Sequence, residues 1–160
     1  MNKNQYSKRY FTSLLIAMCL NILPLSNVVK SLNPDWVLLV LIYWTLAVPE
    51  RVGVFNAWIL GILVDVLTGR LLGMHGLIYA LINYACLKLY RRLRHYPVIQ
   101  QASFVFFCLL MSQVLVFWIE NIQGSTGLTW LFWLPVLTGT ICWPFVSAGL
   151  RWVRVLGRVR

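Results

Sequence analysis

Five long runs without a charged side chain dominate this sequence and limit what it can fold into. The runs cover residues 10–29, 36–49, 71–87, 95–119 and 121–150. About 20 consecutive apolar residues are needed to cross the hydrocarbon core of a bilayer as a helix. Only 11% of the 160 residues are charged and 60% are hydrophobic, whereas soluble domains carry about 25% charged residues. The sequence therefore predicts an all-α membrane protein with one integral membrane domain, residues 1–160, and no sizeable soluble part.

Six transmembrane helices are expected, and the basic residues favour this number. The predicted spans are about 10–29, 33–49, 52–70, 73–90, 99–121 and 129–150. With a cytoplasmic N-terminus, 12 of the 14 Lys and Arg residues face the cytoplasm. They are Lys3, Lys8, Arg9, Arg51, Lys88, Arg91, Arg92, Arg94, Arg151, Arg154, Arg158 and Arg160. A five-span chain, in which residues 33–70 cross once, would put a basic cluster on the wrong side. We therefore expect both termini in the cytoplasm.

The net charge of +10 raises the question of nucleic-acid binding. The basic residues lie in short segments between apolar runs, as the positive-inside rule predicts for membrane proteins. Such segments attract anionic lipids, so we expect anionic lipids as partners and no nucleic acid. The N-terminal run is about twice as long as the apolar region of a signal peptide and lacks a small-residue cleavage site. We interpret it as a retained first helix, with a kink or an early end near Pro24.

Asp65 is the most informative single residue because it lies within an apolar stretch on a row of small residues. The row, with a spacing of four, consists of Gly53, Ala57, Gly61, Asp65, Gly69 and Gly73. Positions four apart share one helix face, and small residues let a second membrane helix approach closely. Asp65 would lie about 7 Å from the midplane, where a carboxylate is costly unless it is paired or hydrated. Two interpretations stay open: a docking face, internal or for a partner's helix, and a carboxylate that only caps or pairs locally.

Two segments next to this row carry turn and helix-start signals. Asn33-Pro34-Asp35 reads as the start of the second span, with Asn33 as N-cap and Asp35 at the positive end of the helix dipole. Gly69 and Gly73 belong to a tight outer turn. Asp35 and Asp65 lie toward the same leaflet on adjacent helices, which suggests intramembrane aspartyl chemistry. Asp35 is expected at the interface, however, whereas a catalytic dyad must share a proton, so the geometry fits poorly.

No catalytic residue, metal site or cofactor is predicted. The sequence contains no G-x-S-x-G, H-E-x-x-H or P-loop pattern. The four cysteines lie in predicted spans, far apart in sequence, and are expected to act as small hydrophobic residues. His75 and His95 lie near opposite ends of one span and cannot share a metal. The intramembrane amides favour hydrogen bonds between helices over a ligand pocket; these residues are Asn21, Asn56, Asn83 and Gln113.

Three parts of the sequence form a recognisable pattern: the segment from Asn33-Pro34-Asp35-Trp36 to Tyr43-Trp44, then Gly61-Ile62-Leu63-Val64-Asp65, then the glycines at 69 and 73. This pattern resembles the MreD family of rod shape-determining membrane proteins. Trp143-Pro144 in the last span and the basic tail are similar to the proteobacterial members. The resemblance covers essentially the whole chain. The matching positions are Pro34, Asp35, Gly61, Asp65, Gly69 and Gly73.

The resemblance implies a non-enzymatic scaffold subunit of the cell-elongation complex in the bacterial inner membrane. Its implied partners are MreC, the MreB filament, and the peptidoglycan synthase formed by RodA and penicillin-binding protein 2. Partners should bind helix faces and the cytoplasmic basic segments; these contain Lys88, Arg91, Arg92, Arg94, Arg151 and Arg154. The family's topology is also similar to the six-helix substrate-binding subunits of vitamin transporters. A solute-binding membrane subunit of a transporter is therefore the alternative.

Overall fold

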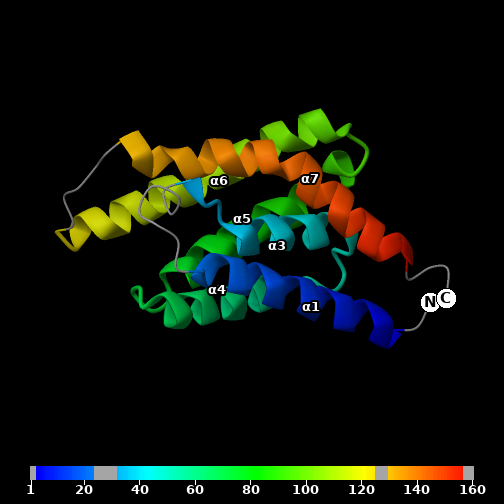
Figure 1. Ribbon diagram of the computed structural model, residues 1–160, viewed down its shortest axis with the longest axis horizontal. Helices are drawn as coiled ribbons and strands as arrows, with labels where there is room; N and C mark the ends of the chain where they lie inside the picture. The colour runs from blue at the N-terminus through cyan, green and yellow to red at the C-terminus, as the bar shows by residue number, and fades with distance from the viewer. Residues whose placement is uncertain (1–2, 24–31, 125–129, 157–160) are drawn as a thin grey trace.

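The fold of the chain, seen in a computed structural model, is a bundle of antiparallel helices (Figure 1). The structure describes residues 3–23, 32–124 and 130–156. Its helices are α1 (Lys3–Ile22), α3 (Trp36–Ala47), α4 (Val54–Thr68), α5 (Met74–Leu93), α6 (Val98–Ile122) and α7 (Leu134–Leu156), with the short 3₁₀ helix η1 (Trp130–Trp133) before α7. Successive helices run in opposite directions, so α1 begins at the end of the bundle where α7 finishes. The expected all-α class is confirmed for the described residues.

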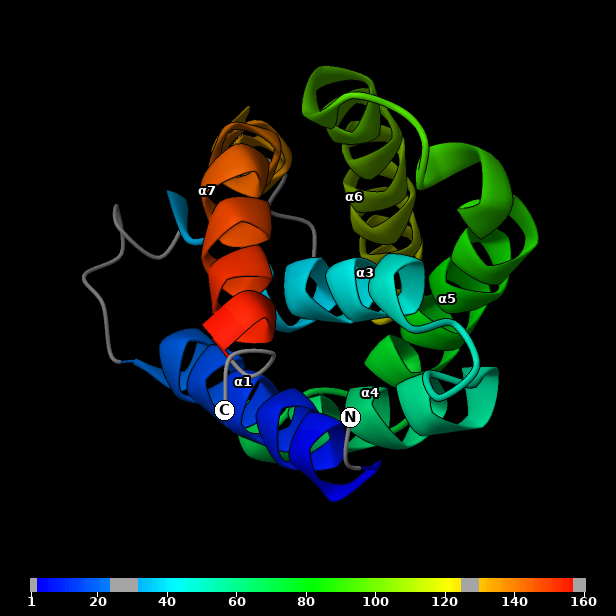
Figure 2. The ribbon, with the colours of Figure 1, turned by 90° about the vertical axis from the view of Figure 1, so that its right-hand side faces the viewer.

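Helix α3 is the centre of the bundle. Every residue from Val37 to Leu46 is buried, and α1, α5 and α7 pack against it (Figure 2). A helix that is apolar on all sides can be surrounded by other helices. Its 12 residues give a length of about 18 Å, which is shorter than the hydrocarbon core of about 30 Å.

The helix bounds differ from the expected spans most in α1 and α7, and α7 (Leu134–Leu156) lies about five residues beyond the expected 129–150. Helix α1 begins at Lys3, before residue 10, and the expected kink at Pro24 falls outside the described residues. Asn33 is not the N-cap of α3, so that prediction is wrong. Asp35 occupies the cap position, and its carboxylate accepts the N–H of Leu38. Among the described residues, α6 and the segment Trp130–Val155 are the two helices both long and apolar enough to cross a membrane.

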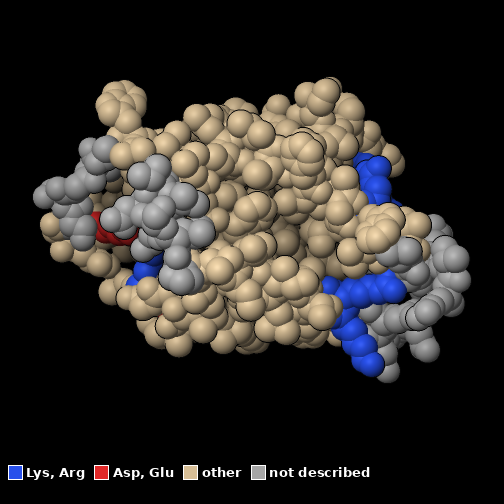
Figure 3. Space-filling view, viewed as in Figure 1, with Lys and Arg blue, Asp and Glu red and all other residues tan. Residues whose placement is uncertain are grey.

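On the face shown in Figure 3, charged residues lie at the two ends of the bundle and the middle shows none. On the face shown, Lys and Arg lie at the end where α1 begins and α7 finishes, called here the basic end. The opposite end, called here the turn end, contains the α4–α5 turn and an ion pair between Arg70 and Glu120 at 3.1 Å. Many large apolar side chains between the ends are exposed, such as Phe55 and Phe145. An exposed apolar belt of this kind fits contact with lipid.

Candidate functional site

The turn between α4 and α5 depends on two glycines with positive φ angles. Gly69, the C-cap of α4, has φ of 65°, and Gly73, the N-cap of α5, has φ of 94°. This left-handed region is costly for residues with a Cβ atom. The predicted tight turn is therefore confirmed, and these two glycines reverse the chain so that α5 returns along α4.

Asp65 is completely buried and caps α5 from the neighbouring helix α4. Its Oδ2 atom accepts the backbone N–H of Gly73 at 2.9 Å, and the N–H of His75 lies 3.0 and 3.1 Å from the two carboxylate oxygens. The His75 Nδ1 atom lies 2.6 Å from Oδ1. If the carboxylate is ionised it can only accept, and Nδ1 then carries the hydrogen. Free N–H groups and a positive dipole at a helix start stabilise a carboxylate, which supports the interpretation of Asp65 as a local cap and pair.

Asp35 joins three helices at the same end of the bundle. Besides capping α3, its Oδ1 accepts a hydrogen bond from the Asn21 amide of α1 at 3.2 Å. The Tyr79 hydroxyl of α5 lies 2.8 and 2.7 Å from the two carboxylate oxygens. Pro34 precedes this cap and packs beside Gly139 of α7. The Asn-Pro-Asp segment thus gathers α1, α5 and α7 around the start of α3.

Helix α5 connects these two carboxylates through adjacent side chains. His75 and Tyr79 are one turn apart, and their ring centroids are 5.7 Å apart in an edge-to-face arrangement. We call Asn21, Asp35, Tyr79, His75 and Asp65 the carboxylate network; its members come from α1, α3, α4 and α5. Among the described residues, no hydrogen bond joins Asp35 to Asp65 directly. Each carboxylate instead accepts hydrogen bonds from its own set of donors. In a catalytic pair of aspartates, by contrast, the two carboxylates share one proton.

The row of small residues faces α5 inside the protein. A Cβ atom on Gly61 would collide with the backbone of Gly76 and with the carbonyl carbon of His75. Ala57 is completely buried, while Gly53 and Gly69 are exposed. The sequence left open whether this face packs against another helix of the same protein or against a partner's helix. In the structure, residues 57–65 pack against α5 of the same protein.

Two of the amides in the predicted spans join structural elements, as expected, and Asn83 is the buried one. Asn83 of α5 donates to the Val52 carbonyl at 3.1 Å and accepts from Thr45 of α3. Gln113 of α6 donates to the Phe132 carbonyl of η1 at 2.7 Å. Asn56 differs, because its amide donates to the nearby Arg51 carbonyl at 3.0 Å. It lines a cavity at the basic end instead of linking two helices.

The cytoplasmic basic segments predicted from the sequence lie at the basic end. Lys88, Arg91, Arg92 and Arg94 are in or next to the last turns of α5, and Arg151 and Arg154 are near the end of α7. Positive side chains are favourable near helix C-termini. The Arg9 guanidinium donates to the Val153 carbonyl at 2.6 Å and ties α1 to α7 there.

Sequence reasoning missed the partners of the two carboxylates. His75 and Tyr79 have the i, i+4 spacing of one helix face, and this spacing was the available signal. Cys86 in α5 also lies close to Cys108 in α6, and both are buried, although the two are far apart in sequence. Within the described part of the chain, no three His, Cys, Asp or Glu side chains come close enough to hold a metal ion.

Comparison with known proteins identifies the family. The family model described as rod shape-determining protein MreD matches residues 4–153. A rod shape-determining protein MreD from Haemophilus influenzae is 28% identical over 155 residues, which are 95% of this chain and 96% of that protein. No solved structure matches this chain. The resemblance found in the sequence is thereby confirmed, and the chain belongs to the MreD family of rod shape-determining membrane proteins.

Proposed function

We propose that the protein is a non-catalytic scaffold subunit of the cell-elongation complex in the bacterial inner membrane. The observation that carries this proposal is the family match over residues 4–153. In this role the protein spans the membrane six times and connects MreC and the peptidoglycan synthase, formed by RodA and penicillin-binding protein 2, to the MreB filament.

The chemistry of the carboxylate network supports a role without catalysis. Asp35 and Asp65 each receive several hydrogen bonds from neighbouring helices. A carboxylate with satisfied oxygens inside a membrane protein holds helices together at lower cost than an unpaired one. Such a network suits a rigid platform on whose outer helix faces other membrane proteins assemble.

The proposed orientation places the basic end in the cytoplasm. Arg91, Arg92, Arg151 and Arg154 then lie where the positive-inside rule puts basic residues, and where anionic lipids and the filament are accessible. The two termini of the chain would be cytoplasmic as well. Cysteine labelling from either side of the membrane tests this orientation independently of the partners.

Recovery of the protein with its neighbours from native membranes tests the scaffold proposal. The tagged protein is extracted in mild detergent, and the proteins and small molecules that accompany it are identified by mass spectrometry. We expect MreC together with RodA and penicillin-binding protein 2. An unrelated tagged membrane protein of similar size serves as the control. Recovery of none of the wall-synthesis proteins above this control would contradict the proposal.

The second candidate is a solute-binding subunit of a transporter. The cavity at the basic end favours it, since Ser7, Arg51 and Asn56 bring polar groups to one place. Small-molecule pockets combine an apolar lining with a few such groups. This alternative predicts a stoichiometric metabolite and an ATP-hydrolysing module in the same pull-down, without wall-synthesis proteins.

A further inference from the structure

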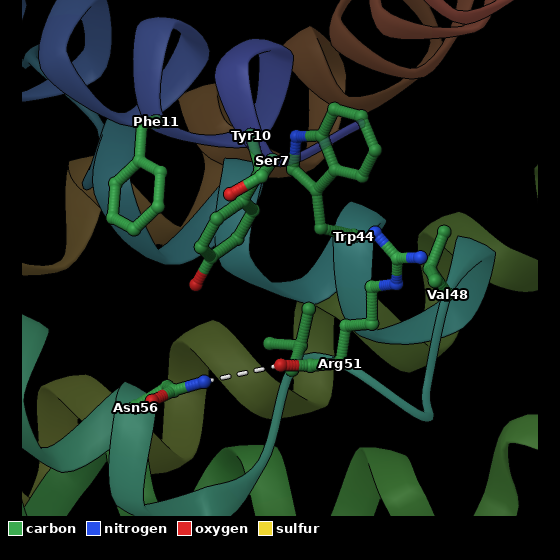
Figure 4. A pocket seen from close by; sticks show the side chains of 8 residues that line it. Ser7, Tyr10, Phe11, Trp44, Val48, Arg51 and Asn56 are labelled. Carbon is green, nitrogen blue, oxygen red and sulfur yellow. Dashed lines mark hydrogen bonds between the residues drawn. The ribbon is translucent and has the colours of Figure 1, made fainter. Parts of the chain in front are cut away.

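A cavity of about 230 Å³ lies between the start of α1 and the turn that joins α3 to α4 (Figure 4). Its walls are formed by Ser7, Tyr10, Phe11, Trp44, Val48, Arg51, Val52 and Asn56. We propose that this cavity binds the phosphate-containing headgroup of an anionic phospholipid. The scaffold proposal places anionic lipids at the basic end in general, whereas this inference assigns one of them a specific site from the cavity.

The lining combines an apolar wall with polar groups and a single sign of charge. Phe11, Trp44 and Val48 supply aromatic and aliphatic surface, whereas Ser7 and Asn56 supply a hydroxyl and an amide. Arg51 brings a positive charge, and none of the lining residues is acidic. A guanidinium group binds phosphate through charge-assisted hydrogen bonds. The chemistry therefore fits a molecule with both an anionic group and an apolar part.

The Tyr10 hydroxyl gives a second, independent indication of a ligand. Its oxygen is buried and has no hydrogen-bond partner among the residues that the structure describes. Figure 4 shows the phenol directed from α1 into the space above Asn56. The Trp44 indole N–H is already bound to the Ser13 hydroxyl at 2.9 Å. Buried polar groups are normally satisfied, and a phosphate or glycerol oxygen in the cavity would accept the Tyr10 hydrogen.

The surroundings favour a lipid over a soluble phosphate compound. The cavity is at the basic end, beside the exposed Lys8 of α1. Phe11 and Leu15 of α1 are 58% and 60% exposed and offer apolar surface next to the cavity for an acyl chain. Drug-sized ligands occupy pockets of roughly 300–1,000 Å³, so the smaller cavity suits a headgroup whose chains stay outside. Basic pockets of membrane proteins recognise anionic headgroups in this way.

Native mass spectrometry of the whole protein with added lipid tests the proposal. The delipidated protein in a neutral detergent is titrated with phosphatidylglycerol, with phosphatidylcholine as the lipid without net charge, and with inorganic phosphate as competitor. The variants are Arg51→Gln and Asn56→Leu in the cavity. The matched control is Arg91→Gln, which removes one positive charge from an exposed side chain at the same end but outside the cavity. Thermal unfolding in detergent verifies that each variant is folded.

We expect one phosphatidylglycerol to bind more tightly than phosphatidylcholine. Arg51→Gln should weaken this binding about tenfold, as for loss of a charge-assisted hydrogen bond, and Asn56→Leu by a smaller factor. Arg91→Gln should weaken this binding far less than Arg51→Gln, because an exposed basic side chain attracts anionic lipids only through general charge. Equal binding by the folded variants and the control would overturn the proposal, because binding would then depend on general positive charge. Displacement of the lipid by inorganic phosphate at similar concentration would overturn it too, because it would assign the site to a soluble phosphate.

Discussion

Asp65 on α4 binds His75 on α5 through both the backbone and the ring of the histidine. The backbone N–H lies 3.0 Å from Oδ2, and Nδ1 lies 2.6 Å from Oδ1. A carboxylate inside the apolar helix α4 thus serves as the cap of the next helix. Tyr79, on the same face of α5, binds Asp35 at the start of the central helix α3. The hydrogen bonds of the carboxylate network therefore connect four helices, α1, α3, α4 and α5.

Replacing Asp65 by Leu should destabilise the fold strongly. The change leaves the N–H groups of Gly73 and His75 without their acceptor, and breaking a buried, hydrogen-bonded charge costs about 3–5 kcal/mol. Asp65→Asn keeps one acceptor oxygen and should be intermediate. Thermal unfolding in detergent and the amount of protein in the membrane measure the effect. Glu120→Gln, at the same end but partly exposed, is the control, and equal stability of all three variants would contradict the role of Asp65.

A side chain on Gly61 should force α4 and α5 apart. Its Cβ would collide with backbone atoms of Gly76, which cannot move as a flexible side chain can. Overpacking of this kind costs about 1–3 kcal/mol, so Gly61→Ala should lower the unfolding temperature. Gly149→Ala in α7 meets nothing within 4 Å and should be neutral or slightly stabilising. A Gly61→Ala protein as stable as the Gly149→Ala protein would show that α4 and α5 are not this close.

Loss of the Tyr79 hydroxyl should weaken the attachment of α5 to α3. A hydrogen bond to a charged group contributes about 1.5–3 kcal/mol, and Tyr79→Phe removes it without creating a cavity. The effects of Tyr79→Phe and Asp35→Asn should be less than additive, because both remove the same contact. The exposed Tyr84 provides the control substitution Tyr84→Phe. Full additivity in the double-mutant cycle would mean that the two side chains do not interact.

Cys86 and Cys108 should form a disulfide when the protein is oxidised. Their thiols lie close together where α5 packs on α6, and a disulfide needs two cysteines whose Cα atoms are within about 7 Å. Cys19→Ser and Cys142→Ser remove the other two cysteines and simplify peptide mapping by mass spectrometry. A second variant, in which Cys86 and Cys108 are replaced by Ser and Cys19 and Cys142 are kept, provides the comparison. Faster linkage of Cys19 to Cys142 would be incompatible with the observed packing of α5 on α6.

The sequence predicted the all-α class of the described residues because charge-free runs of membrane length have few other structures available. It also indicated the importance of Asp35 and Asp65, since carboxylates in such helices need partners. The partners were not predictable, because His75 reaches Asp65 only through the φ angles of Gly69 and Gly73. Asn33 was a wrong choice of N-cap because Asn and Asp have similar capping preferences and both occur in this segment.

The central position of α3 could not be derived from its residues. An apolar helix without a polar face is equally compatible with lipid on all sides and with burial among other helices. Trp44 and Trp58 illustrate the difficulty, since both lie in apolar segments of the sequence. Trp44 is buried in α3, but Trp58 on α4 is 42% exposed. Burial depends here on which helices are neighbours, and that information is not contained in the periodicity of one helix.

The most direct test asks whether the carboxylate network holds the helices together or binds a partner. It measures how much MreC is recovered per folded molecule when the network is altered. Tagged Asp65→Asn and Tyr79→Phe proteins are extracted from membranes, the folded amount is measured by fluorescence-detected gel filtration, and MreC is quantified in the same fractions. If the network holds helices together inside the scaffold, both variants should be less abundant while the folded molecules retain MreC in the same ratio as the unmodified protein. Normal abundance with loss of MreC would contradict the account, because the network would then contact the partner itself.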